Sequence, residues 1–478
     1  MTAPSLRADP PRADPSLPRG ADSARWSKRC AGPVVTELRL AAFGAHRGTV
    51  VPLAPLTLLT GPSGSGTSSA LRAYEALSRL AAGSPLDEVF PDPAGCVPEG
   101  TGADRRGRRG FRIGCTADGP VGPVRLELAV QAEPALRIVG EQLTLDGETL
   151  LSTALRHPAQ PTLQAAWHTA DELPVTRERL PDDRLGTALL PLRVAGRTPG
   201  QLLVLAAAEQ LVVALRPAFV CEPRPHRMRT PVPPGEGRLR RDCGNLAAVL
   251  HAAYEGQGHA RGRGRGDGGG HGGVGGYAYG RRHARLVALA DAGCARPVTG
   301  LRVERLADGQ VHAVVGRGDG PGTPLERLGD GELRYLALAA ALLLGPGEDP
   351  ADAGSEVPAA LQTRTVLADG FDRDLDGRQT RELLTEAASA VAGGRVRLLG
   401  TVTESGAARA RGMAGATVVD LRGTAGATVA DPCGTAGATV ADPRGTAGAT
   451  VVDLRGTAGA TVADPCGTAG ATVVDLGP

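Results

Sequence analysis

One stretch decides the fold: Leu56-Thr-Leu-Leu-Thr-Gly61-Pro-Ser-Gly-Ser-Gly66-Thr67-Ser68-Ser69. Its apolar start predicts a strand, and the apolar spacing that follows predicts a helix from Ser68 to about Ala82. The glycines between them let backbone amides turn toward the centre of the loop, where the helix N-terminus adds partial positive charge. The stretch therefore predicts a loop that holds an anionic phosphate.

This loop fits the GxxxxGK[ST] pattern in spacing and in its strand-to-helix context, with one departure. Thr67 stands where the pattern has lysine, and Ser68 is placed to hold Mg²⁺. A plain glycine and serine turn between a strand and a helix is the alternative interpretation of the segment taken alone. The predicted phosphate contacts are Gly61, Ser63, Gly64, Ser65, Gly66, Thr67, Ser68 and Ser69.

Two later segments accompany the loop. The first, Leu328-Gly-Asp-Gly-Glu-Leu-Arg-Tyr-Leu336, opens a predicted helix from about Gly331 to Leu344. The second, Val366-Leu-Ala-Asp-Gly-Phe-Asp-Arg-Asp-Leu-Asp376, starts as a predicted strand and ends where the next helix begins. Taken alone, the first segment is equally well explained as a glycine turn that caps an apolar helix.

The order and context of the three segments resemble AAA-family ATPases with an ABC/SMC-like P-loop NTPase domain. The segment from Leu328 resembles the ABC signature, which commonly reads LSDGxLRxLAL, and Asp369 to Asp376 resembles the Walker B and D-loop pattern DExxxxLD. A shorter stretch, Arg241-Asp-Cys-Gly-Asn-Leu246, also resembles a recurrent segment of the family. The resemblance implies ATP and Mg²⁺ as cofactors, with Ser68 and Asp369 at the metal.

The same resemblance implies that two chains hold ATP between them as a homodimer. Asp330, Gly331 and Glu332 of each signature then contact the nucleotide on the partner's phosphate loop. Because fold-level analogy covers DNA repair, transport and defence systems alike, the process served stays open.

Four positions depart from the family pattern. Thr67 replaces the loop lysine, Gly329 the signature serine, Gly370 the catalytic glutamate and Val402 the switch histidine. Since lysine and general base both contribute to turnover, the sequence predicts ATP binding with weak or absent hydrolysis. Asp372 and Glu404 are the candidate catalytic substitutes. A non-catalytic scaffold and a DNA-associated ATPase of repair or phage-defence type are the alternative functions.

The predicted fold class is α/β, with an ABC-like mixed central sheet, an antiparallel subsheet and a helical insertion. Strands are predicted around 35–40, 50–60, 111–115, 124–130, 136–145, 218–221, 365–369 and 396–401, and helices at 199–215, 245–254 and 376–391. The predicted organisation is a disordered leader at 1–33, ATPase parts at 34–222 and 284–423, a connector at 223–255, a flexible insertion at 256–283 and tandem repeats at 424–478.

The insertion is rich in glycine and arginine, and its Arg261-Gly-Arg-Gly-Arg-Gly266 run resembles RGG-type segments that contact RNA. A flexible surface loop is the simpler interpretation of this composition. The formal net charge of +2 gives no global argument for nucleic-acid binding. Binding of nucleic acid through this tract is therefore left as an open alternative.

Near-identical units of eleven residues, each with an Ala-Gly-Ala-Thr-Val core, fill the chain from Met413 to Pro478. The first copy, Ala416 to Leu421, is predicted as the last strand of the ATPase sheet, and the others as disordered or as a small β-stack.

The eight cysteines are scattered without a CxxC pair, which is typical of a reduced, cytoplasmic chain. The N-terminus is polar and no apolar run is long enough for a membrane helix, so no membrane association is predicted.

Overall fold

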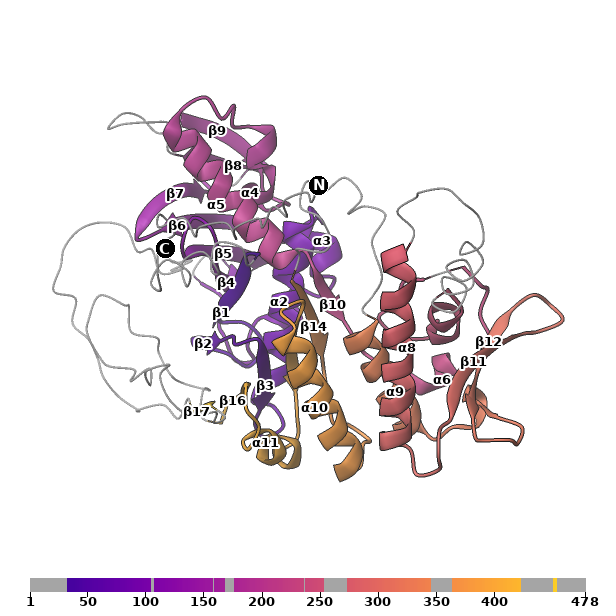
Figure 1. Ribbon diagram of the computed structural model, residues 1–478. Helices are drawn as coiled ribbons and strands as arrows, with labels where there is room; N and C mark the ends of the chain where they lie inside the picture. The colour runs from indigo at the N-terminus through magenta and orange to yellow at the C-terminus, as the bar shows by residue number, and fades with distance from the viewer. Residues whose placement is uncertain are drawn as a thin grey trace, which may run out of the picture.

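The computed structural model describes residues 32–104, 107–157, 159–167, 176–235, 237–252, 273–344, 363–422 and 450–453. Residues 1–31 of the predicted leader at 1–33, and most of the repeats at 424–478, lie outside these residues. The described chain forms two large sheets, a small third sheet and the helices that cover them (Figure 1).

The first sheet is antiparallel and has the order β2-β1-β4-β5-β6-β7-β8-β9. Its strands alternate buried and exposed positions, as the period of two requires for a sheet with one covered face. Their bounds are β1 Val34–Ala41, β2 Thr49–Pro52, β4 Arg109–Asp118, β5 Val124–Glu133, β6 Arg137–Leu145, β7 Glu148–Ala154, β8 Thr162–Trp167 and β9 Thr176–Pro181.

The second sheet is parallel throughout, with the order β10-β14-β15-β3-β16-β17. All five residues of β3 are buried, because neighbouring strands and helices cover it on both sides. The bounds are β3 Leu56–Thr60, β10 Ala218–Val220, β14 Arg364–Ala368, β15 Val396–Thr401, β16 Ala416–Asp420 and β17 Thr450–Asp453.

The predicted second strand at 50–60 is two strands in different sheets. β2 pairs with β1 in the antiparallel sheet, and β3 lies between β15 and β16 in the parallel sheet. β2 ends at Pro52 and Pro55 directly precedes β3, and because proline cannot donate a ladder hydrogen bond, the apolar run does not continue as one strand. The prediction of a single strand was wrong because residues 50–60 form one mostly apolar run.

Helices cover both large sheets, and some of them share a hydrophobic core with the small sheet β11-β12-β13. The helices are α2 Thr67–Ala81, α3 Leu86–Val89, α4 Gly186–Leu189, α5 Pro199–Leu215, α6 Pro225–Met228, α8 Gly273–Gly293, α9 Asp330–Leu343, α10 Gly377–Ala392 and α11 Glu404–Ala410. The small sheet contains β11 Gly300–Arg305, β12 Val311–Gly316 and β13 Thr323–Pro324.

One expectation at a low-complexity segment needs revision. Helix α8 begins at Gly273, inside the segment 256–283 that composition predicts as a flexible insertion, whose part 256–272 lies outside the described residues. The stretch from Tyr277 contains alanine, arginine and no proline, so glycine content alone was a poor guide there. β16 is a strand of the parallel sheet as expected, and Thr450–Asp453 from a later repeat pairs with it in parallel register.

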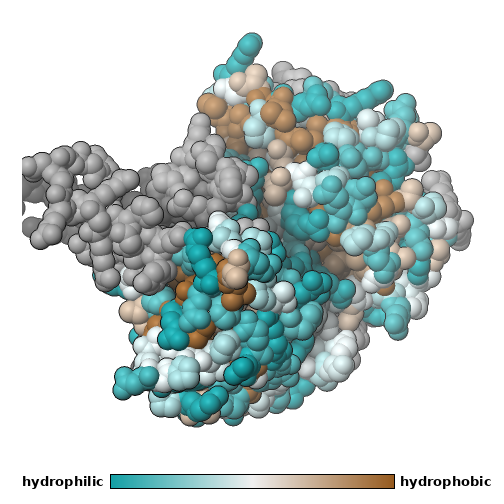
Figure 2. All heavy atoms as spheres, turned by 90° about the vertical axis from the view of Figure 1, so that its right-hand side faces the viewer, coloured by the Kyte–Doolittle hydropathy of each residue, from teal (hydrophilic) through white to brown (hydrophobic). Residues whose placement is uncertain are grey.

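Apolar side chains gather on the upper part of the molecule in Figure 2, the region that contains β8, β9, α4 and α5 in Figure 1. The large exposed apolar side chains there are Leu192, Leu202 and Leu203. Among the described helices, no segment has the length and hydropathy needed to cross a bilayer.

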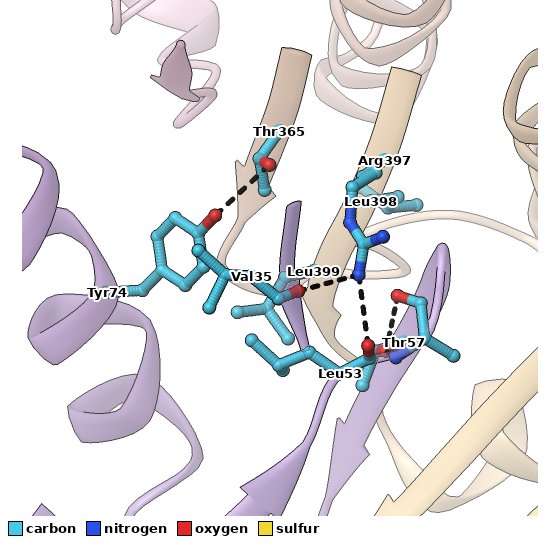
Figure 3. A pocket seen from close by; sticks show the side chains of 9 residues that line it. Val35, Leu53, Thr57, Tyr74, Thr365, Arg397, Leu398 and Leu399 are labelled. Carbon is cyan, nitrogen blue, oxygen red and sulfur yellow. Dashed lines mark hydrogen bonds between the residues drawn. The ribbon is translucent and has the colours of Figure 1, made fainter. Parts of the chain in front are cut away.

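Arg397 on β15 joins the two large sheets across a small internal space (Figure 3). Its Nη2 donates to the carbonyl oxygens of Val35 at 2.9 Å and Leu53 at 3.0 Å. Nearby, the Tyr74 hydroxyl on α2 lies 3.2 Å from Thr365 Oγ1 on β14. Burial lowers the pKa of Arg397 and raises that of Tyr74 to about 12. The hydrogen bonds satisfy both buried polar groups.

Arg397→Met should lower the free energy of unfolding by about 2–4 kcal/mol, because two buried carbonyl oxygens lose their donor. Urea unfolding followed by circular dichroism measures the change. Arg381→Met on the exposed face of α10 is the matched control and should stay within about 0.5 kcal/mol of the parent chain. An equal loss in both variants would contradict the role given to Arg397.

Candidate nucleotide-binding site

The phosphate loop follows β3 and ends at the first turn of α2. Gly64 and Gly66 have φ angles of 86° and 91°, which only glycine adopts without strain. No acidic residue lies in the first turn of α2, so no side chain of the helix itself offsets the partial positive charge at its N-terminus. The loop thus has the backbone conformation and the polarity that a phosphate group requires.

His46 supports this loop through hydrogen bonds, and no sequence pattern indicated this role. The imidazole is buried, with Nδ1 3.1 Å from Thr49 Oγ1 and Nε2 2.9 Å from the Gly66 carbonyl oxygen. Because a carbonyl only accepts, Nε2 carries the proton. Burial lowers the pKa of His46, which favours this neutral form. A Cβ on Gly66 would lie 2.5 Å from Nε2, so the close contact also requires glycine at this position.

Three strands bring the predicted metal ligands together behind the loop. Ser68 Oγ lies 3.0 Å from each carboxylate oxygen of Asp369, which comes directly after β14. Between their strands, the last residue of β15, Thr401, donates to Asp369 Oδ1 at 2.6 Å and accepts from the Gly370 amide at 2.7 Å. Thr401 is a site residue that the sequence did not single out.

These groups fit a Mg²⁺-nucleotide. A hydroxyl and a carboxylate beside a phosphate loop are the hard oxygen ligands that Mg²⁺ prefers in nucleotide sites. Ser65 Oγ, inside the loop, is buried and has no hydrogen-bond partner among the described residues, although Ser65 as a whole is partly exposed. A buried hydroxyl oxygen usually has a hydrogen-bond partner, and none of the described residues provides one for Ser65 Oγ.

The signature-like segment starts helix α9 and lies close to Asp374, in the segment between β14 and α10. Asp330 pairs with Arg229 at 2.6 Å, and Glu332 lies 3.7 Å from Arg317. A Cβ on Gly331 would stand 2.5 Å from the Asp374 carbonyl oxygen, so only glycine permits this close approach. Asp330 and Glu332 therefore have cationic partners within their own chain.

Arg334, four residues into α9, fixes the segment that follows β14. Its guanidinium donates to the carbonyl oxygens of Arg373 at 3.0 Å, Pro223 at 3.0 Å and Gly370 at 3.1 Å. Burial, and then the charge of Arg373, lower the pKa of Arg334. Arg334 belongs to the signature-like segment that starts at Leu328. Nothing else in the sequence indicated that this arginine contacts the segment after β14.

The two candidate catalytic substitutes have different surroundings. Asp372 is buried, and both its oxygens accept hydrogen bonds from Thr403, which starts α11. Glu404 is exposed and pairs with Arg411 at 2.8 Å and Arg422 at 3.2 Å. Each carboxylate therefore has partners within the chain.

The Arg241–Leu246 segment contacts helix α2 and the end of β10 through ion pairs of Arg241. Arg241 pairs with Glu222, which follows β10, at 2.7 Å, and with Glu75 on α2. Cys243 Sγ lies 3.7 Å from Cys221 Sγ, and this contact together with burial raises the pKa of Cys243. The segment thereby connects β10 to the helix that carries the phosphate loop.

No family model and no curated protein matches the chain. Among solved structures, it is similar to an Smc head bound to the C-winged helix domain of ScpA, at 11% identity and a TM-score of 0.40 over 79% of this chain and 93% of that one. A Pyrococcus furiosus Smc head bound to the C-terminal domain of ScpA gives 10% identity and 0.39 over 79% and 92%. The Thermotoga maritima SMC head domain gives 11% and 0.35 over 78% and 90%.

The chain has the α/β fold of a P-loop NTPase with an ABC-like arrangement of sheets. A parallel sheet carries the phosphate loop after β3 and Asp369 after β14, and an antiparallel sheet packs beside it. The strand order of the parallel sheet and the Ser68–Asp369 contact are the features of this chain that define the fold.

Gly331→Ala should lower the free energy of unfolding by about 1–3 kcal/mol, because its methyl group would overlap the Asp374 carbonyl oxygen. Gly329→Ala is the matched control: nothing lies within 4 Å of a Cβ there, and its φ is −66°. Thermal and urea unfolding compare the two. A Gly331→Ala chain as stable as the control would show that α9 does not pack against the D-loop in this way.

Proposed function

We propose that this protein binds Mg²⁺-ATP at the phosphate loop, as a relative of the AAA-type ATPases with an ABC/SMC-like head, and hydrolyses it slowly or not at all. The observation that carries the proposal is the convergence of Ser68, Thr401 and Asp369 behind a glycine-rich loop at a helix N-terminus. In an open parallel sheet, the carboxyl ends of the strands are where ligands bind.

Each residue has a defined part in this proposal. The backbone amides of Ser63, Gly64, Gly66 and Thr67 and the N-terminus of α2 hold the phosphate groups. Ser68 provides an oxygen ligand to Mg²⁺, and Asp369, held by Thr401, binds the hydrated metal. The metal supplies charge neutralisation on the phosphates when bound. His46 keeps Gly66 in the conformation that exposes the amides.

Slow turnover follows from the residues around the site. Gly370 has no side chain to act as general base, and the Asp372 carboxylate is engaged by Thr403. Glu404 is neutralised by two arginines on its own surface. A missing general base typically costs about 10²–10⁴ in rate. Binding tolerates these losses better than hydrolysis, because the loop amides and the metal ligands remain.

A nucleotide-dependent homodimer is part of the proposal. Asp330 is exposed, and Gly329 leaves the N-terminus of α9 without a side-chain cap. The first turn of α9 therefore has amide groups available for the phosphate of a second chain. A scaffold that uses this fold without nucleotide is the competing function. Absence of Mg²⁺-ATP binding at millimolar concentration would favour that scaffold.

Titration calorimetry should detect Mg²⁺-ATP binding that Asp369→Ala weakens at least about tenfold, because a charge-assisted contact contributes about 1.5–3 kcal/mol. Asp319→Ala, on an exposed loop, is the control and should bind as the parent does. Phosphate release should stay below about 0.1 s⁻¹, under the ordinary enzyme range. Turnover near about 1 s⁻¹ that Asp369→Ala abolishes would refute the slow-hydrolysis proposal.

Thr67→Lys should tighten Mg²⁺-ATP binding about 10- to 100-fold, because it adds a cation at the start of α2, within reach of the phosphates. Hydrolysis should remain slow, since Gly370 still provides no base. Calorimetry and phosphate release measure the two effects separately. An unchanged affinity would show that the loop does not hold the phosphates in the proposed way.

A further inference from the structure

The side chain of Arg373 occupies the space next to Gly370. A Cβ built on Gly370 would lie 2.8 Å from Arg373 Nε and 2.9 Å from Cζ. The guanidinium therefore stands where the side chain of residue 370 would otherwise project. Gly370 directly follows Asp369, the proposed metal-binding residue that contacts Ser68. A cation thus lies where the sequence pattern would place a carboxylate.

The backbone of Arg373 is fixed, whereas its guanidinium has no partner among the described residues. The amide of Arg373 donates to the Gly370 carbonyl oxygen at 3.0 Å, and its carbonyl oxygen accepts from Arg334 Nε at 3.0 Å. In the part of the chain that the structure describes, the guanidinium forms neither a hydrogen bond nor an ion pair, and the residue is exposed. A turn held at both ends presents one unpaired cation beside the metal-ligand carboxylate.

The carboxylates closest in sequence are not its partners. Asp369 accepts from Ser68 and Thr401, and Asp372 accepts from Thr403. Asp374 instead lies 3.8 Å from Arg334 Nε. Arg334 adds a second guanidinium on the carbonyl side of Gly370, so two positive groups flank one glycine. An anion between the phosphate loop and Gly370 would relieve their mutual repulsion.

We propose that the Arg373 guanidinium binds the terminal phosphate of the nucleoside triphosphate and supplies the positive charge that Thr67 cannot. This inference rests on the proposed function, because it assigns a further phosphate-binding residue to the same site. Arginine suits the task, since its planar fork binds phosphate oxygens with two parallel hydrogen bonds. The same placement leaves no room for a general base at residue 370.

Calorimetric titration with Mg²⁺-ATP and with Mg²⁺-ADP tests the assignment on the full chain. Arg373→Ala should weaken Mg²⁺-ATP binding about tenfold or more, and Mg²⁺-ADP binding less than about threefold, because only the triphosphate has the contacted group. Arg373→Lys should bind Mg²⁺-ATP more tightly than Arg373→Ala but more weakly than the parent, since the charge remains and the planar fork is lost. Arg381→Ala, which removes an exposed arginine on α10, should change neither value.

The outcomes separate the two proposals. If the parent chain binds Mg²⁺-ATP in a manner that needs Asp369 but not Arg373, the inference is wrong and the proposed function stands. An equal loss of ATP and ADP affinity in Arg373→Ala, or an Arg373→Lys chain as weak as Arg373→Ala, would show a structural role and also overturn the inference. If the parent binds neither nucleotide, both proposals fail.

Discussion

The hydrogen bond between Ser68 and Asp369 is the contact on which the site depends. It joins residues 301 positions apart, and it forms only if β3, β15 and β14 lie side by side in parallel. Parallel strands place their carboxyl ends at one edge of a sheet, which is why the phosphate loop, Thr401 and Asp369 meet. Arg397 then holds this sheet against the antiparallel one through two backbone carbonyls.

Local sequence patterns predicted the helices and strands around the site. They did not predict strands that form mainly because a neighbouring strand pairs with them. The helix after the phosphate loop was predicted correctly because its apolar residues recur at helical spacing, and the helix at 199–215 because it is a long, strongly apolar run. Strands β7, β8 and β9 were missed. They are short, and they continue a ladder that starts at β4, so the neighbouring strand stabilises them more than their own composition does.

The candidate site was partly predictable for the same reason. The phosphate loop stood out because glycine spacing is a local signal, and Asp369 because its segment combines an apolar strand with a following helix. His46 and Thr401 act on residues distant in sequence, so their own surroundings in the chain give no indication of the contact. Arg373 was missed because its position matters only in relation to Gly370 in space.

The charges around Gly370 argue for one kind of chemistry over another. Activating water requires a carboxylate that is free to accept a proton, and the carboxylates of Asp369 and Asp372 already accept hydrogen bonds from hydroxyl groups. The two guanidinium groups beside Gly370 favour a bound anion instead. In the proposed nucleotide site, Arg373 would place positive charge near residue 370, while Thr67 places none in the phosphate loop. Such an arrangement would preserve attraction for the nucleotide without a general base at residue 370.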